Sequence, residues 1–115
     1  MPQGYDALFL EFVRRFNAGE FFESHEALEE LWHRAGGELG RFYQGLIQLA
    51  VALEHLTRRN RVGAQRLLAR AKGNLKAFLP RYHGIALETL LEEAEVCIRE
   101  ERTEGPFPRI VLEEG

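Results

Sequence analysis

Residues 38–58 constrain the fold more than any other part of the chain. Their apolar side chains recur at helical spacing and cover most of a helical wheel: Phe42, Tyr43, Leu46, Ile47, Leu49, Ala50, Val51, Leu53 and Leu56. A helix that is apolar on nearly every side needs neighbours all round, so it usually lies in the middle of a helical protein. The stretch therefore predicts a central helix.

Four further helices are predicted around it. Apolar residues at three- and four-residue spacing occupy residues 5–17, 21–35, 61–79 and 85–101. Asp6 is placed to cap the first of these helices, and Pro80 ends the 61–79 helix. Short connections favour antiparallel neighbours. We expect an all-α, single-domain bundle of about five helices over residues 1–115, with the third helix at its centre.

The end of the chain is predicted to be extended. Residues 104–115 contain Gly105, Pro106 and Pro108, which do not suit a helix. Phe107 and Ile110 are expected to anchor this tail on the bundle.

Composition excludes several classes of protein. The net charge is −3 over 115 residues, which shows no overall bias towards nucleic acid. The beginning of the chain lacks a signal-peptide pattern, and the longest apolar run, LIQLAVAL, is too short to span a bilayer. The single cysteine, Cys97, fits a reducing compartment. We expect a cytoplasmic protein without a membrane segment; no feature predicts a cofactor, and self-association stays open.

Two polar stripes interrupt otherwise apolar helices. On the helix containing FFESHEALEELWH, His25 falls in the same arc as Phe21, Leu28 and Trp32, with Glu29 at its edge. On the central helix the amides and a histidine share one stripe. A buried polar group without a partner costs about 1–3 kcal/mol. We therefore expect the two stripes to meet as an enclosed polar cluster between the second and third helices, with these candidates: His25, Glu26, Glu29, Gln44, Gln48 and His55.

Three blocks of the chain resemble the domain of unknown function 309 family of small bacterial proteins. They are FNAGEFFESHEALEELW at residues 16–32, the segment at residues 42–75, and FPRI at residues 107–110. The resemblance implies an all-helical single domain, and it implies that the polar candidates and Trp32 occupy the family's characteristic positions. It implies no activity. Glu54 departs from the apolar or aromatic residue expected there.

The polar cluster has several interpretations. It is a structural hydrogen-bond network, a small-ligand pocket, or a catalytic site in which His25 acts as a general base oriented by Glu29 or Glu26. No nucleophile accompanies His25 in this pattern. His25, Glu29 and His33 also form a partial metal set at i, i+4 and i+8. The set lacks the second histidine of H-E-x-x-H, and amides such as Gln48 are poor ligands for transition metals.

A basic segment is the second candidate surface. No Asp or Glu occurs between His55 and Leu87, while basic residues accumulate there: Arg58, Arg59, Arg61, Arg66, Arg70, Lys72, Lys76 and Arg81. No aromatic residues alternate with these charges for base stacking, which argues against nucleic acid. Charge pairing with the acidic fifth helix, or a protein-interaction surface at residues 58–81, explains them better. His83 is expected to be exposed.

Overall fold

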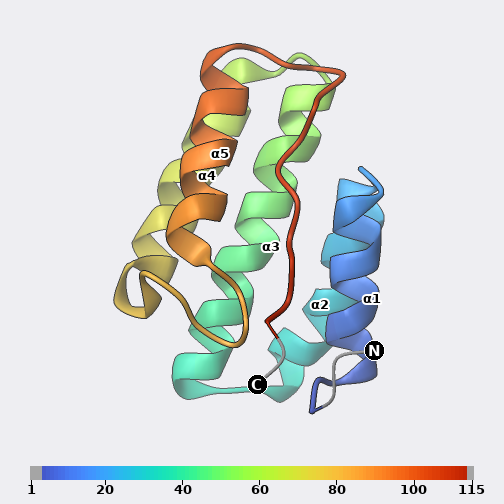
Figure 1. Cartoon of the computed structure of the whole chain (residues 1–115), viewed down its shortest axis with the longest axis vertical. Coiled ribbons are helices and arrows are strands. Elements are labelled where there is room, and N and C mark those ends of the chain that lie inside the picture. Colours follow the sequence, from blue (N-terminus) through green and yellow to red (C-terminus); the bar gives the residue numbers. More distant parts are fainter. Residues whose placement is uncertain (1–3, 114–115) are drawn as a thin grey trace.

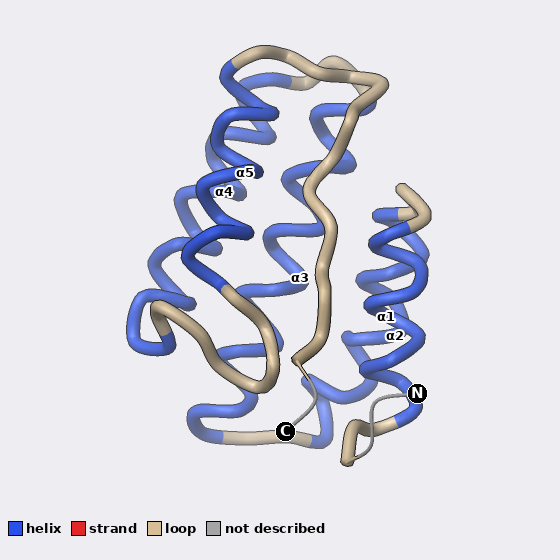
Figure 2. Tube along the Cα trace, viewed as in Figure 1, coloured by secondary structure: helices blue, strands red, loops and turns tan. Residues whose placement is uncertain are grey.

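The computed structural model describes residues 4–113, and the helices there are α1 (Ala7–Asn17), α2 (Phe21–Arg34), α3 (Gly37–Thr57), α4 (Arg61–Leu75), the short 3-10 helix η1 (Lys76–Phe78) and α5 (Leu87–Arg99). Within residues 4–113 there is no β-strand, only an isolated bridge between Tyr82 and Ile85 (Figure 2). The predicted all-α fold is confirmed. The fourth helix ends earlier than predicted, since the chain tightens into η1 after Leu75.

α3 is the central helix, as predicted. It packs against α2 and α4 and also touches α5, while α1 packs on α2. In Figure 1, α1 and α2 stand on one side of α3, and α4 and α5 on the other. The chain that follows α5 crosses in front of α3, between α5 and α1. α1, this tail and α5 therefore cover one side of the layer formed by α2, α3 and α4.

Local signals explain where the helices begin. The Asp6 side chain accepts a hydrogen bond from the Leu8 backbone N at 2.8 Å and caps α1, as expected. Asn60 caps α4 by accepting from the Gly63 backbone N at 3.0 Å. Arg59, with φ of 63°, takes the left-handed conformation that separates α3 from α4.

The core fills the space between α3 and the covering elements. Its largest fully buried side chains are Phe9, Phe12, Phe16, Phe21, Phe42, Leu28, Leu46, Leu49, Leu53, Leu56, Leu75 and Ile85. Gly45 allows α4 to pack close to α3, because a Cβ at this position would lie 2.5 Å from Cγ of Leu75. At this level the Leu75 side chain of α4 therefore packs directly against the backbone of α3.

The tail lies on the bundle through the residues expected to anchor it. Ile110 is 3% exposed, and the Phe107 ring packs edge-on against Phe21 with centroids 5.2 Å apart. The Asn17 side chain bonds to the Ile110 backbone. These contacts hold the tail against α1 and α2.

The described helices carry no bilayer-spanning segment. None of those in residues 4–113 combines the length and the apolar character that crossing a membrane requires.

Candidate functional site

One side of the central helix is only half covered. Five half-buried residues of α3 fall within an arc of about 100°, and we call them the α3 stripe: Gln44, Ile47, Gln48, Val51 and His55. The fully buried leucines of α3 lie on the other side of the helix. The stripe contains three of the polar candidates that the sequence singled out, and it carries no Lys, Arg, Asp or Glu.

Two residues of the α3 stripe contact α4. Gln48 Oε1 accepts a hydrogen bond from Asn74 Nδ2 at 2.7 Å. His55 Nδ1 lies 3.2 Å from Asn60 Nδ2. Because Asn60 Oδ1 already accepts from the Gly63 backbone N, the amide nitrogen of Asn60 faces the ring, and Nδ1 of His55 is the acceptor. Gln48 and His55 therefore find their partners on α4 or at its start.

His25 finds its partner on its own helix. Its side chain is 17% exposed, and Nε2 lies 3.7 Å from Oε2 of Glu29. The ring also packs edge-on against Phe22, with centroids 5.0 Å apart. Glu29 Oε1 in turn lies 3.6 Å from Nε2 of His33, and the side chains of Glu29 and His33 are 47% and 64% exposed. These separations exceed hydrogen-bond length, so His25, Glu29 and His33 form a loose row of polar side chains along one side of α2.

The predicted enclosed cluster is therefore corrected to two separate sets of contacts. In the part of the chain that the structure describes, no hydrogen bond or ion pair joins His25 or Glu29 to Gln48 or His55. Glu26 is exposed. The reason is the rotation of the helices about their axes: His25 lies at the edge of the buried face of α2, and Gln48 points towards α4.

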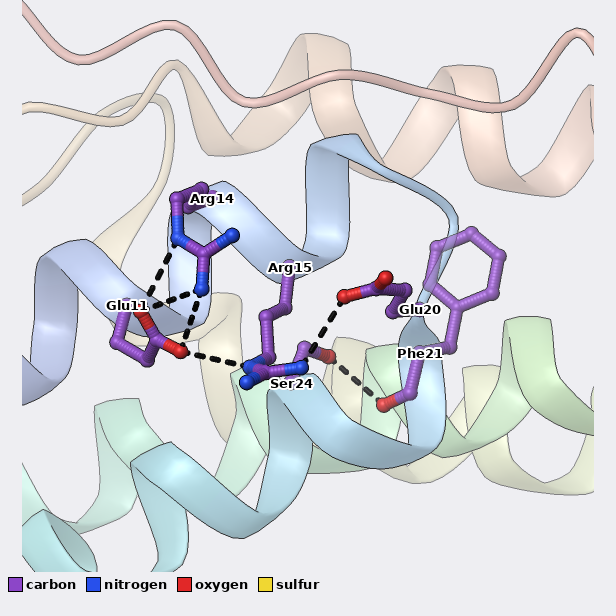
Figure 3. Close-up of polar contacts among 6 residues, drawn as sticks. All are labelled: Glu11, Arg14, Arg15, Glu20, Phe21 and Ser24. Carbon is purple, nitrogen blue, oxygen red and sulfur yellow. Dashed lines mark hydrogen bonds and ion pairs between the residues drawn. The ribbon is translucent and has the colours of Figure 1, made fainter.

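The fully buried polar residue of α2 is Ser24, which sequence reasoning set aside. Its Oγ donates to the Phe21 carbonyl oxygen at 2.7 Å, so it is satisfied within its own helix (Figure 3). Nearby, Arg15 bonds both Glu11 at 2.7 Å and Glu20 at 3.2 Å, which ties α1 to the start of α2. These are structural contacts, and neither Ser24 nor its surroundings offers an activated nucleophile.

The metal interpretation of α2 is also corrected. Among residues 4–113, no group of three or more His, Cys, Asp or Glu side chains is arranged to hold a metal ion. His25 and His33 approach different oxygens of Glu29, so the three donors are not directed at one point.

Cys97 is part of the core. The side chain is 1% exposed, and burial raises the pKa of its thiol. Its Sγ lies 3.9 Å from the Arg102 carbonyl oxygen and 3.8 Å from that of Pro106, where the tail turns back. A buried, protonated thiol is a poor nucleophile.

Half of the eight basic residues of the segment pair with carboxylates of residues 4–113, but only Lys72 pairs with the fifth helix itself. Lys72 bonds Glu95 of α5 at 2.7 Å, which lowers the pKa of Glu95. The other pairs are Arg61 with Glu101, Arg58 with Glu54, and Arg81 with Glu113. Four exposed basic residues form no ion pair with the rest of residues 4–113: Arg59, Arg66, Arg70 and Lys76.

Two of these arginines belong to a stripe on α4 beside the α3 stripe. The α4 stripe spans about 80° of the wheel and consists of Gly63, Arg66, Arg70 and Asn74. Asn74 bonds Gln48, and a Cβ on Gly63 would lie 3.1 Å from His55 Cγ, so both ends of this stripe adjoin α3. Lys72, which reaches α5, lies on the opposite flank.

A similar stripe runs along α2. It covers an arc of about 100° and consists of Phe22, His25, Glu26, Glu29 and His33. α2, α3 and α4 are joined by short loops, so neighbours are antiparallel. The buried face of each of these helices points towards α1, the tail or α5. Each stripe lies on the other side of its helix, so the three stripes face away from α1, the tail and α5. We call the three stripes together the outer face.

The structure corrects the expectation for His83. Its ring is half-buried among aromatic side chains, with centroid distances of 4.9 to 6.4 Å to these rings: Tyr5, Phe9, Phe42, Tyr43 and Tyr82. Burial lowers the pKa of His83. No local pattern around Pro80 and Gly84 signals this environment, because it is assembled from the start of the chain, α3 and the loop before α5.

Comparison with known proteins finds the same family that the sequence blocks resemble. The family model described as "Domain of unknown function (DUF309)" matches residues 9–67, from α1 to the middle of α4. "Uncharacterized protein YpuF" of Bacillus subtilis (strain 168) is 33% identical over an alignment of 112 residues that covers 94% of this chain. The chain spans 64% of the length of that relative. The matched segment contains the α2 stripe and the α3 stripe.

Proposed function

The chain belongs to the DUF309 family of domains of unknown function, and we propose that it is a protein-interaction module that binds through the outer face of α2, α3 and α4. The family model ends at residue 67, so the second half of α4, all of α5 and the tail lie outside the matched segment. The α2 and α3 stripes lie inside it.

The distribution of charge on the outer face carries the proposal. Its centre, the α3 stripe, is uncharged and contains half-buried Ile47 and Val51. The charged residues that flank this stripe lie at its two ends: exposed Arg41 near the start of α3, and the ion pair of Glu54 with Arg58 at its end. The two edges of the outer face are charged, with Glu26 and Glu29 on α2 and Arg66 and Arg70 on α4. Protein interfaces have this organisation, with charged residues depleted at the centre and a polar rim around it. An ordinary solvent-facing side of a helix would carry Lys and Glu at its middle.

The other interpretations have less support. A small-ligand or catalytic site needs convergent polar groups in an enclosed place. Here the carboxylate of Glu29 is 47% exposed, and Gln48 and His55 are engaged with α4. A nucleic-acid surface needs a basic patch, but Arg58, Arg61 and Lys72 are paired with carboxylates.

Cross-linking from single positions tests the proposal. A photoreactive amino acid in place of Gln44, at the centre of the outer face, should form a discrete covalent adduct with another protein chain in living cells. The same residue in place of Thr89, which is exposed on α5, is the matched control and should form none. Adducts at neither position, or equally at both, would contradict the proposal.

Stability separates an interaction surface from a structural network. His25→Ala should lower the free energy of unfolding by less than about 1 kcal/mol, because the polar contact of His25, 3.7 Å to a Glu29 side chain that is 47% exposed, exceeds hydrogen-bond length, and the Phe22 that its ring packs on is itself 47% exposed. A member of an enclosed network would cost about 1–3 kcal/mol. Gln48→Ala is the comparison, because it removes a real hydrogen bond to Asn74.

A further inference from the structure

The geometry points to a second copy of this chain as the partner of the outer face, related to the first by a two-fold axis that runs parallel to α3. The inference rests on the proposed function and names the partner for it. It depends on three properties of the outer face: its charge asymmetry, the direction of its helices and its uncharged centre.

The outer face is negative along one edge and positive along the other. The exposed carboxylates of α2 that border it include Glu26 and Glu30, and α2 has no Lys or Arg before Arg34. On α4, Arg66 and Arg70 are exposed and form no ion pair within residues 4–113. A face with one acidic and one basic edge is complementary to itself when a partner is turned so that opposite edges meet.

Only one orientation of a two-fold axis brings opposite edges together. An axis parallel to α3 places α2 of each copy over α4 of the other. An axis across the helices places α2 over α2 and α4 over α4, so that like charges face each other. Unlike charges therefore select the parallel axis, and the resulting interface uses the same patch on both copies.

The acidic and basic residues also lie at similar heights along the helix axes. α2 and α4 run in the same direction, because each is antiparallel to α3. Counted at 1.5 Å per residue from the loops that join them to α3, Glu26 and Arg70 lie within about 6 Å of the same level, which is within reach of an arginine side chain. A two-fold axis parallel to the helices preserves level, so Glu26 of one copy meets Arg70 of the other, twice per dimer.

The centre of the face then pairs with itself. α3 of one copy lies along α3 of the other, and half-buried Ile47 and Val51 become covered on both. The molecule measures 35 × 26 Å in the plane of this layer (Figure 1), so the face offers at most about 900 Å² per copy. A standard protein interface buries about 800 Å² per partner, so a dimer of standard size covers most of this face.

Charge reversal tests this arrangement in the full-length protein. Analytical ultracentrifugation should give a dimer of the 13.2 kDa chain, with a dissociation constant that rises with salt. Glu26→Arg and Arg70→Glu should each weaken the dimer at least tenfold, because each places like charges together at two sites. The double variant E26R/R70E should recover most of the loss, since the reversed pair is again complementary. Both positions are exposed, so folding is retained, which circular dichroism checks.

The controls separate this inference from the proposed function. Val51→Glu should abolish the dimer by placing two carboxylates at the axis, whereas Glu92→Arg, exposed on α5, should leave it unchanged. A wild-type chain that stays monomeric at millimolar concentration, or a dimer that ignores V51E, would overturn the inference. In that case adducts from position 44 to a different protein would still uphold the interaction module, and the absence of adducts would refute both.

Discussion

The side chain of Asn17 makes two hydrogen bonds to the backbone of Ile110, 93 residues further along the chain. Oδ1 accepts from the Ile110 N at 2.7 Å, and Nδ2 donates to the Ile110 carbonyl oxygen at 2.8 Å. Asn17 is the last residue of α1, so this contact holds the tail against the end of that helix. An amide carries a donor and an acceptor side by side, so this one side chain satisfies both backbone groups of Ile110.

Removing this amide should loosen the tail. Asn17→Ala is expected to lower the free energy of unfolding by about 1–3 kcal/mol, because two partly buried backbone groups lose their partners. Hydrogen exchange gives the local readout: the Ile110 amide should exchange faster. The Glu113 amide, which bonds the Gly84 carbonyl oxygen, is the internal control and should change less. Unchanged exchange at Ile110 would contradict the clamp.

The buried side chain of Ile110 should matter as much as its backbone. Ile110→Ala is expected to cost about 2–5 kcal/mol, because the side chain is 3% exposed and its loss leaves a cavity. Val111→Ala, at a side chain that is 75% exposed, should change stability by less than about 0.5 kcal/mol.

Deleting residues 105–115 should lower the melting temperature, and a truncated chain that melts like the full chain would show that the tail contributes nothing.

Two glycines in helices should respond in opposite directions to the same substitution. Gly45→Ala should destabilise the protein by about 1–3 kcal/mol, because the new methyl group would lie 2.5 Å from Cγ of fully buried Leu75. Gly73→Ala should stabilise it by about 0.5–1 kcal/mol, because nothing lies within 4 Å of the added Cβ and alanine favours the helix. Urea denaturation of both variants measures the signs, and equal signs would refute the packing argument.

The buried ring of His83 should make stability depend on pH. Burial lowers the pKa of His83 below its ordinary value of 6.5, so the unfolded chain takes up a proton that the folded protein resists. The free energy of unfolding is therefore expected to be higher above pH 6.5 and to decrease as the pH falls below it.

A substitution isolates the contribution of His83 to this pH dependence. Asparagine tolerates the left-handed backbone at this position, where φ is 52°, so His83→Asn should fold, although with less aromatic packing. Its stability should depend less on pH between about pH 7.5 and pH 5 than that of the parent. His33→Asn, at an exposed histidine, is the matched control. An H83N variant with the parent's pH profile would show that His83 is not responsible.

Much of the fold was predictable because the signals that specify it are local. The all-round apolar pattern of residues 38–58 identified the central helix, and Asp6 marked the start of α1 through its own side-chain cap. Turn residues and prolines separated the helices. Periodicity within one helix also identified Gln44, Gln48 and His55 as members of one polar stripe, and the structure places all three on the same half-covered side of α3.

Partners between helices were decided by the tertiary structure alone. A stripe on a wheel does not say which neighbour it meets, since that depends on the rotation and level of each helix in the bundle. Gln48 therefore bonds Asn74 of α4 and not His25 of α2, and His83 lies among rings contributed by Tyr5 and by α3. The sequence by itself determined the helices and which residues share a face; only packing decided what each face touches, because contacts between distant segments depend on how the whole core is filled.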